Sequence, residues 1–152
     1  MNIRDFRPFT QVSALTLGGG GIGQVWGETT KEEAIQTVHT ALDHGINHFD
    51  VAPMYGRGEA ERVVGESLHG KNTDDLFFTT KCQLGTLPDS EVYDKLNTSL
   101  TESLDNLGLE KVNLFLLHSQ LIEDSFKLFK FDELRQKSTT TLSCFFNSAI
   151  PA

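Results

Sequence analysis

The sequence has 152 residues, 38% of them hydrophobic and 22% charged, which is the composition of one folded domain and excludes wholesale disorder. The formal net charge of −8 disfavours nucleic acid and anionic membranes as partners. No stretch approaches the roughly 18 consecutive apolar residues of a membrane span, and the amino terminus lacks the apolar region of a secretory signal. Two cysteines, Cys82 and Cys144, give neither a disulfide framework nor a metal-type pairing, so we expect a cytoplasmic protein.

The first third of the chain predicts a hairpin, a strand and a helix. Residues 4–13 have the mixed character of a small hairpin, and residues 14–17 predict a strand. The glycine-rich stretch 18–23 follows at once, as a loop whose backbone turns tightly or approaches a ligand. Thr30 and Glu33 have the spacing of a capping box. The helix that they begin has one apolar face before Gly45, formed by Ala34, Ile35, Val38, Ala41 and Leu42.

Three further strands alternate with two helices up to residue 118. The strands are predicted at 46–49, 76–80 and 112–117, and the helices begin after Tyr55 and at Asp89 or Ser90. Strand starts at 46, 76 and 112 are 30 and 36 residues apart, which suits right-handed βαβ units. We therefore predict an α/β fold with about four parallel strands and three helices.

The alternation ends after His118. We expect residues 1–118 to form the structured unit and residues 119–152 to be an irregular, loop-like tail that leads toward a fourth helix. Within this tail, residues 138–147 are uncharged, β-prone and free of proline, which is typical of aggregation-prone segments.

Polar side chains stand at the ends of the predicted strands. Asp50, Lys81 and His118 each follow a strand directly, and Tyr55 lies in the loop after Asp50. Because the carboxyl ends of parallel strands meet at one edge, where such folds carry their active sites, we expect these four residues to lie together.

These residue types suit proton transfer to a carbonyl group. A free tyrosine has a pKa of about 10, too high for an efficient proton donor at neutral pH, and a neighbouring ammonium group favours its phenolate. We expect Lys81 to supply that ammonium group and Asp50 to hold it in place. His118 would donate a hydrogen bond to the carbonyl oxygen. Together these groups would protonate the oxygen while a hydride arrives at the carbon.

The run GINHFDVAPMYGRGEAE at 45–61 resembles the signature of the aldo-keto reductase family. Its matching positions include Gly45, Asp50, Ala52, Tyr55 and Gly56, with the acidic residue of the signature at Glu59 and Glu61 close behind. Lys81 and His118 also stand where that family has its lysine and histidine. The resemblance implies Tyr55 as general acid, Lys81 and Asp50 as its tuning pair, and His118 as the residue that orients the carbonyl. It also implies the amino-terminal half of a (β/α)8 TIM barrel and hydride transfer from NADPH to a small-molecule aldehyde or ketone.

The glycine-rich stretch resembles the loop after the family's first barrel strand. The resemblance implies that Gly20, Gly21 and Ile22 approach the cofactor through their backbone, with Asp50 beside it. Trp26 would wall the substrate pocket together with Tyr55 and His118. The stretch also contains G-x-G-x-x-G, which is typical of a Rossmann turn, but no acidic residue follows about 20 positions later at a strand end. We prefer a barrel loop.

Two further sites are weighed against this interpretation. His48 and Asp50 would share one face of a strand, as metal ligands do, but no further cluster clearly completes a site, so we predict no metal. Cys82 would be a reactive thiol if the neighbouring Lys81 lowered its pKa; the alternative is that it takes no part in the chemistry.

The number of strands leads to a second functional hypothesis. A (β/α)8 barrel takes about 250 residues, and most cofactor contacts of the family lie in its carboxyl-terminal half. We therefore expect a truncated chain with weak NADPH binding, which self-associates through open sheet edges. The two hypotheses are NADPH-dependent carbonyl reduction and an incompetent fragment that acts as an interaction module or has no role.

Overall fold

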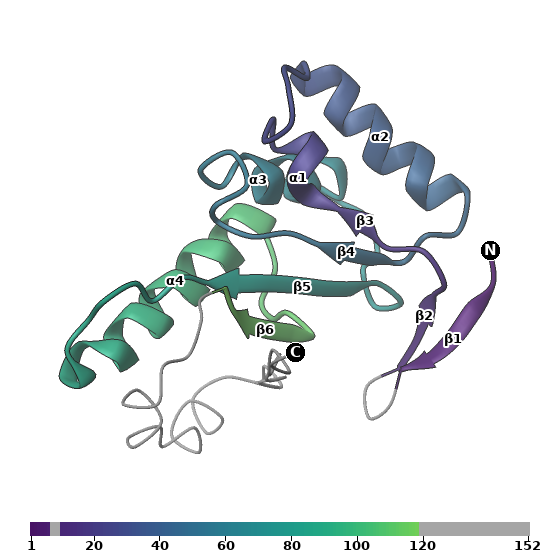
Figure 1. Cartoon of the computed structure of the whole chain (residues 1–152). Coiled ribbons are helices and arrows are strands. Elements are labelled where there is room, and N and C mark those ends of the chain that lie inside the picture. The colour runs from purple at the N-terminus through teal and green to yellow at the C-terminus, as the bar shows by residue number, and fades with distance from the viewer. Residues whose placement is uncertain (7–9, 119–152) are drawn as a thin grey trace, which may run out of the picture.

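The computed structural model describes residues 1–6 and 10–118, in which a hairpin precedes a single run of strands and helices (Figure 1). The predictions for the tail 119–152, including the segment 138–147, lie outside the described residues. The elements in chain order are β1 (Ile3–Phe6), β2 (Thr10–Ser13), β3 (Leu17–Gly18), α1 (Gly19–Ile22), α2 (Lys31–Asp43), β4 (His48–Asp50), α3 (Glu59–Ser67), β5 (Phe77–Cys82), α4 (Asp89–Leu107) and β6 (Leu114–Leu117).

One parallel sheet organises the described chain. Its strand order is β3-β4-β5-β6, the same as the order in the sequence, and at least one helix separates each strand from the next. This is a succession of βαβ units, which confirms the predicted α/β fold. The strands β1 and β2 pair antiparallel in a separate sheet, as predicted for residues 4–13.

The predicted helices form where their sequence signals stand. At the start of α2, the Thr30 hydroxyl accepts a hydrogen bond from the Glu33 amide, and the Glu33 carboxylate accepts one from the Thr30 amide. This is the reciprocal capping box. At the end of α4, Gly108 adopts a left-handed conformation with φ of 65°, which glycine reaches without steric cost.

The strands differ from the prediction at their ends. The predicted strand 14–17 is largely wrong, because the amide of Ala14 donates to the carbonyl of Asn2 and only Leu17 joins the sheet, followed by Gly18. Asp50 and Lys81 lie inside β4 and β5 rather than after them, since each pairs with a residue of the next strand. The glycine-rich stretch begins with the single helical turn α1 instead of an open loop.

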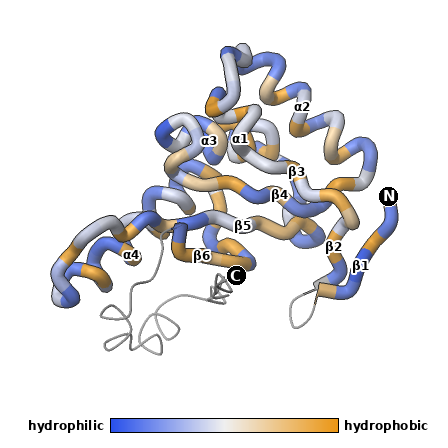
Figure 2. The backbone as a smooth tube through the Cα atoms, viewed as in Figure 1, coloured by the Kyte–Doolittle hydropathy of each residue, from blue (hydrophilic) through white to orange (hydrophobic). Residues whose placement is uncertain are grey.

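The two faces of the sheet carry different side chains. On one face, the helices pack over an apolar core that includes Phe49, Phe78 and Phe115. On the other, a small cluster of Val12, Phe77 and Leu114 joins the hairpin to the amino ends of the strands. Figure 2 shows β5 changing from apolar at its amino end to polar toward its carboxyl end. The face opposite the helices is therefore apolar near the amino ends of the strands and can carry polar side chains near their carboxyl ends.

No helix within residues 1–6 and 10–118 has both the length and the apolar character needed to cross a membrane.

Candidate active site

Lys81 reaches the site because of its position in β5. All six residues of this strand are buried, and alternate side chains point to opposite faces. Phe78 and Cys82 belong to the core under the helices, so Lys81 points to the other face, where it is only 8% exposed. The neighbouring strand β4 ends at Asp50 on that same face.

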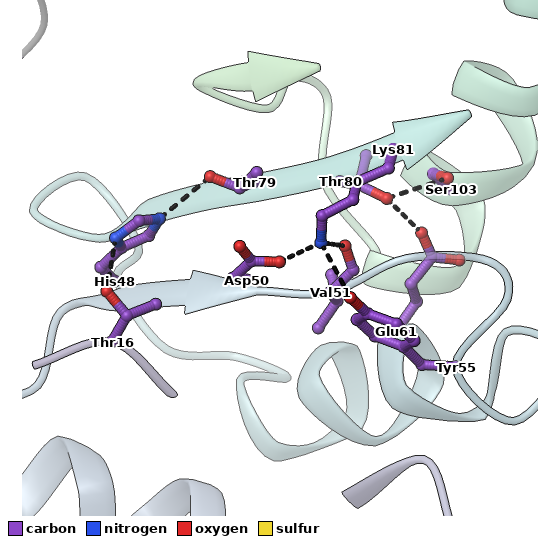
Figure 3. Close-up of polar contacts among 10 residues, drawn as sticks. All are labelled: Thr16, His48, Asp50, Val51, Tyr55, Glu61, Thr79, Thr80, Lys81 and Ser103. Atoms are coloured by element: carbon purple, nitrogen blue, oxygen red, sulfur yellow. Dashed lines mark hydrogen bonds and ion pairs between the residues drawn. The ribbon is translucent and has the colours of Figure 1, made fainter. Parts of the chain in front are cut away.

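The ammonium group of Lys81 meets three oxygen atoms (Figure 3). It forms an ion pair with the Asp50 carboxylate, donates to the backbone carbonyl of Val51 over 3.0 Å, and donates to the hydroxyl oxygen of Tyr55 over 3.3 Å. An ammonium group has three donors, so this set of acceptors compensates its removal from water. The arrangement holds a positive charge beside the phenolic oxygen.

Tyr55 is fixed by close backbone packing around its loop. A Cβ atom at Gly19 would lie 3.0 Å from the Tyr55 ring, and one at Gly23 would lie 2.8 Å from the Tyr55 carbonyl oxygen. Gly56 has φ of 66°, and a Cβ there would lie 2.2 Å from the Gly23 carbonyl oxygen. Only glycines allow α1 and the Tyr55 loop to come this close. The sequence prediction missed Gly19 and Gly23, although both lie in the glycine-rich stretch.

His118 follows β6 and completes the group. Its amide donates to the Cys82 carbonyl over 2.7 Å, and its ring meets the Tyr55 ring edge-on with centroids 5.7 Å apart. Burial lowers the pKa of His118, and the Lys81 ammonium lowers it further, against an opposing effect of Asp50. The neutral imidazole that this favours keeps one N–H donor. His118 Nδ1 is buried without a hydrogen-bond partner in the described part of the chain.

The structure thus brings together Asp50, Tyr55, Lys81 and His118. A cleft of about 430 Å³ borders Lys81 and His118. Arg57 and Lys95 also line it, and no sequence motif predicts either of them there. The remaining lining residues are Pro53, Met54, Gln83, Ser99 and Glu102.

Three of the four residues predicted to contact the cofactor lie in α1, and the fourth, Asp50, ends β4. Gly20 and Ile22 are buried, while Gly21 has open space where a side chain would stand. Trp26 is 81% exposed, covers Gly20 with its ring, and is not among the residues that line the cleft beside Lys81 and His118.

The comparison with protein families identifies the family of the chain. The model described as "Aldo/keto reductase family" matches residues 14–138. The chain belongs to the aldo/keto reductase family. The predicted family resemblance is therefore confirmed.

Relatives of this aldo/keto reductase chain are longer than the chain itself. L-galactose dehydrogenase of Arabidopsis thaliana is 31% identical over 110 residues, which cover 71% of this chain and 34% of the relative. The solved thermostable aldo-keto reductase Tm1743, in complex with the inhibitor epalrestat, has a TM-score of 0.73 at 27% identity, with 95% of this chain and 53% of that one covered. An aldo-keto reductase from Klebsiella pneumoniae, in complex with NADPH, has a TM-score of 0.72 at 21% identity, with 95% and 50% covered.

The chain thus spans about a third of the length of this curated relative and about half of these solved structures. The four parallel strands with their helices are the amino-terminal half of the family's (β/α)8 barrel, as predicted.

His48 and Cys82, the residues weighed for a metal site and a reactive thiol, have structural contacts in this aldo/keto reductase chain. Both ring nitrogens of His48 are hydrogen-bonded, to the hydroxyls of Thr16 and Thr79, each over 2.9 Å. Within residues 1–6 and 10–118, no three potential metal ligands of the His, Cys, Asp or Glu type lie together. Cys82 points into the helix-side core, and burial raises the pKa of its thiol, which opposes the reactive thiolate.

Proposed function

We propose that this chain supplies the proton-transfer groups for NADPH-dependent reduction of an aldehyde or ketone. The observation that supports this most strongly is the contact of the Lys81 ammonium with both Asp50 and the Tyr55 hydroxyl. A positive charge next to a phenol stabilises the phenolate that proton donation leaves behind. The Asp50 carboxylate balances that charge in the partly buried site.

Each group has one role in the proposed reaction. The Tyr55 hydroxyl gives its proton to the carbonyl oxygen, and the Lys81 ammonium stabilises the resulting phenolate. His118, in its neutral form, donates a hydrogen bond to the same carbonyl oxygen and orients it. NADPH, when bound, supplies the hydride that reduces the carbonyl carbon.

We infer that Gly20, Gly21, Ile22 and Asp50 face the cofactor. Apart from their chain neighbours and the backbone of the same helix, no heavy atom lies within 4 Å of the point where a Cβ of Gly18 or Gly21 would stand, so the backbone beside the Tyr55 loop is open to a ligand. The choice of NADPH follows the family resemblance, and the solved Klebsiella pneumoniae aldo-keto reductase of the same fold is in complex with NADPH. We include Trp26 as a substrate contact in this proposal. We also propose that the protein works in the reducing cytoplasm, because Cys82 is a free thiol.

Tyr55→Phe tests the proton donor. The chain has two tyrosines, so Tyr93→Phe on α4 makes the same chemical change away from the site. We expect Tyr55→Phe to lower the rate of NADPH oxidation by an aldehyde by at least about 100-fold, because general acid catalysis typically contributes 10²–10⁴. The measurement is absorbance at 340 nm with NADPH up to millimolar concentration. Retained turnover in Tyr55→Phe, or equal loss in Tyr93→Phe, would remove Tyr55 from this role.

Cofactor binding is tested separately by fluorescence titration of residues 1–152 with NADPH. We expect weak binding, since the contacts proposed for this chain are few and made largely by backbone. Tyr55→Phe should leave the affinity within about twofold of wild type because the hydroxyl serves the transition state. Saturable micromolar binding would contradict the expectation of weak affinity without affecting the role of Tyr55.

A further inference from the structure

A fully buried glutamate stands behind the site without a role in the proposed reaction. Glu61 is the third residue of α3 and is 0% exposed. Its carboxylate binds neutral groups: the Thr80 hydroxyl donates to one oxygen over 2.6 Å, and the Asn106 amide donates to the other over 3.1 Å. A buried carboxylate is costly unless its oxygens are hydrogen-bonded. The bonds of Glu61 therefore constrain the groups that donate them.

The first of these groups is the direct neighbour of Lys81. Thr80 is also 0% exposed, and it points to the helix face of β5 while Lys81 points to the opposite face (Figure 3). Ser103 of α4 lies 3.4 Å from the Thr80 hydroxyl oxygen. Holding the Thr80 side chain fixes the rotation of the strand at this point, and with it the direction in which Lys81 leaves the backbone.

The same glutamate fixes the helix that carries the Tyr55 loop. Asn106 lies at the end of α4, so the Glu61–Asn106 bond ties the first turn of α3 to α4. The amide of Ala60 donates to the Tyr55 carbonyl over 3.2 Å, so this turn of α3 also anchors Tyr55. Glu59, two residues earlier, instead pairs with Arg62 at the surface.

We propose that Glu61 is a positioning residue, which binds Thr80 and the first turn of α3 together and so keeps Lys81 within hydrogen-bonding distance of Tyr55. The functional role of this arrangement rests on the proposed carbonyl reduction. The geometry itself is measurable without cofactor or substrate, so the two proposals fail independently.

Histidine NMR of the cofactor-free chain reports the position of Lys81. The Lys81 ammonium contributes to the lowered pKa of His118, so a displaced Lys81 lets that pKa rise. Thr80→Val removes the hydroxyl without changing net charge or β-branching. We expect the His118 titration to move to higher pH as the neighbouring charge recedes. The nuclear Overhauser contact between the Tyr55 and His118 rings should weaken as well.

Substitutions of Glu61 distinguish the displacement of Lys81 from the loss of the Glu61 carboxylate. Loss of a carboxylate alone would lower the pKa of His118, so an upward shift in Glu61→Leu has the opposite sign to the charge effect and is the direction expected when Lys81 is displaced. We expect that upward shift, and we expect Glu61→Gln, which fills the same space and keeps one acceptor oxygen for the Thr80 hydroxyl, to restore most of the wild-type titration.

Two controls define the outcome. Ser67→Ala removes another buried hydroxyl bond of α3, 2.6 Å to the Val63 carbonyl, and should lower the melting temperature without moving His118. Glu59→Gln removes a charge from the same turn and should leave His118 in place. The proposal is overturned if folded Thr80→Val keeps the wild-type titration and ring contact, and this variant decides the matter if Glu61→Leu does not fold.

Discussion

Lys81 is the side chain on which the other polar groups of the site converge. One carboxylate, one backbone carbonyl and one phenolic oxygen surround its ammonium group. The Asp50 side chain is 36% exposed, so water still solvates its carboxylate when Lys81 is removed. The Lys81 side chain is 10% exposed, so its ammonium group depends on its protein partners. Removing the Asp50 carboxylate should therefore destabilise the fold more than removing the Lys81 ammonium group, because it leaves a buried charge without its ion-pair partner.

Lys81→Met should raise the pKa of His118. Removing the ammonium removes a repulsion of the imidazolium, and the Asp50 carboxylate left behind favours the charged ring, so both effects have the same sign. Histidine NMR titration measures the change. Lys95→Met is the control, since Lys95 lines the same cleft but does not contribute to the shift of His118. An unchanged or lower pKa in Lys81→Met would show that the Lys81 charge does not hold down the pKa of His118.

The meeting of the four polar residues could be predicted because three of them stand at or beside the carboxyl ends of neighbouring parallel strands, and Tyr55 lies in the loop after β4. The importance of Glu61 could not be predicted in the same way. Glu59 and Glu61 are equivalent carboxylates in the sequence, and the general rule sends both to the surface. Only the packing of α3 on β5 and α4 buries Glu61 and leaves Glu59 paired with Arg62.

At the scale of elements, α3 and α4 approach each other closely at Gly65. A Cβ at Gly65 would lie 2.5 Å from the Asn106 carbonyl oxygen and 2.8 Å from backbone atoms of Leu107. Backbone atoms cannot rotate away as a side chain does. Gly65 lies one turn after Glu61, so the same face of α3 carries both the tight contact and the buried carboxylate.

Gly65→Ala should destabilise the chain by about 1–3 kcal/mol, the usual cost of an added group in a packed core, despite the higher helix propensity of alanine. Urea unfolding followed by circular dichroism measures the change. Gly21→Ala is the matched control, because its Cβ position meets no atom within 4 Å from outside its own helix and chain neighbours. Equal stability of the two variants would contradict the close approach of α3 and α4.

Helices were predicted better than strands, for a physical reason. The signals of α2 and α4 are local: a capping box, a 3.6-residue apolar period and a terminal glycine. The extent of a strand depends on partners far away in the sequence. The amide of Ala14 donates to the Asn2 carbonyl, and the amide of Ser13 donates to the Asn47 side-chain oxygen. These residues therefore do not join the parallel sheet, and β3 is reduced to Leu17–Gly18.

At the scale of the whole molecule, the described sheet ends in β3 on one side and β6 on the other. The backbone groups on the outer side of an edge strand are available to a strand of another chain. Two copies that pair through these edges would assemble eight parallel or mixed strands. We propose this as the mode of self-association for residues 1–152.

Sedimentation velocity between about 5 and 200 µM tests this self-association, with the weight-average mass expected to rise toward that of a dimer, as in mass-action equilibria. Gly18→Lys is the variant designed to block this pairing, because an edge lysine opposes strand pairing. Gly18 lies on the edge strand β3, and the space around its Cβ position is open. We expect this variant to lower the dimer fraction. A monomer mass across the whole range would rule out the edge-pairing proposal.

The alternation of side chains along β5 has a consequence for how such a chain can diversify. Phe78, Thr80 and Cys82 face the helices and carry the packing, while Thr79 and Lys81 face the other way and carry polar contacts. Substitutions on the helix face of β5 therefore act first on packing and reach the polar group only through the backbone, as proposed for Thr80. Substitutions of Thr79 or Lys81 act on the polar contacts directly and leave the helix-side core in place.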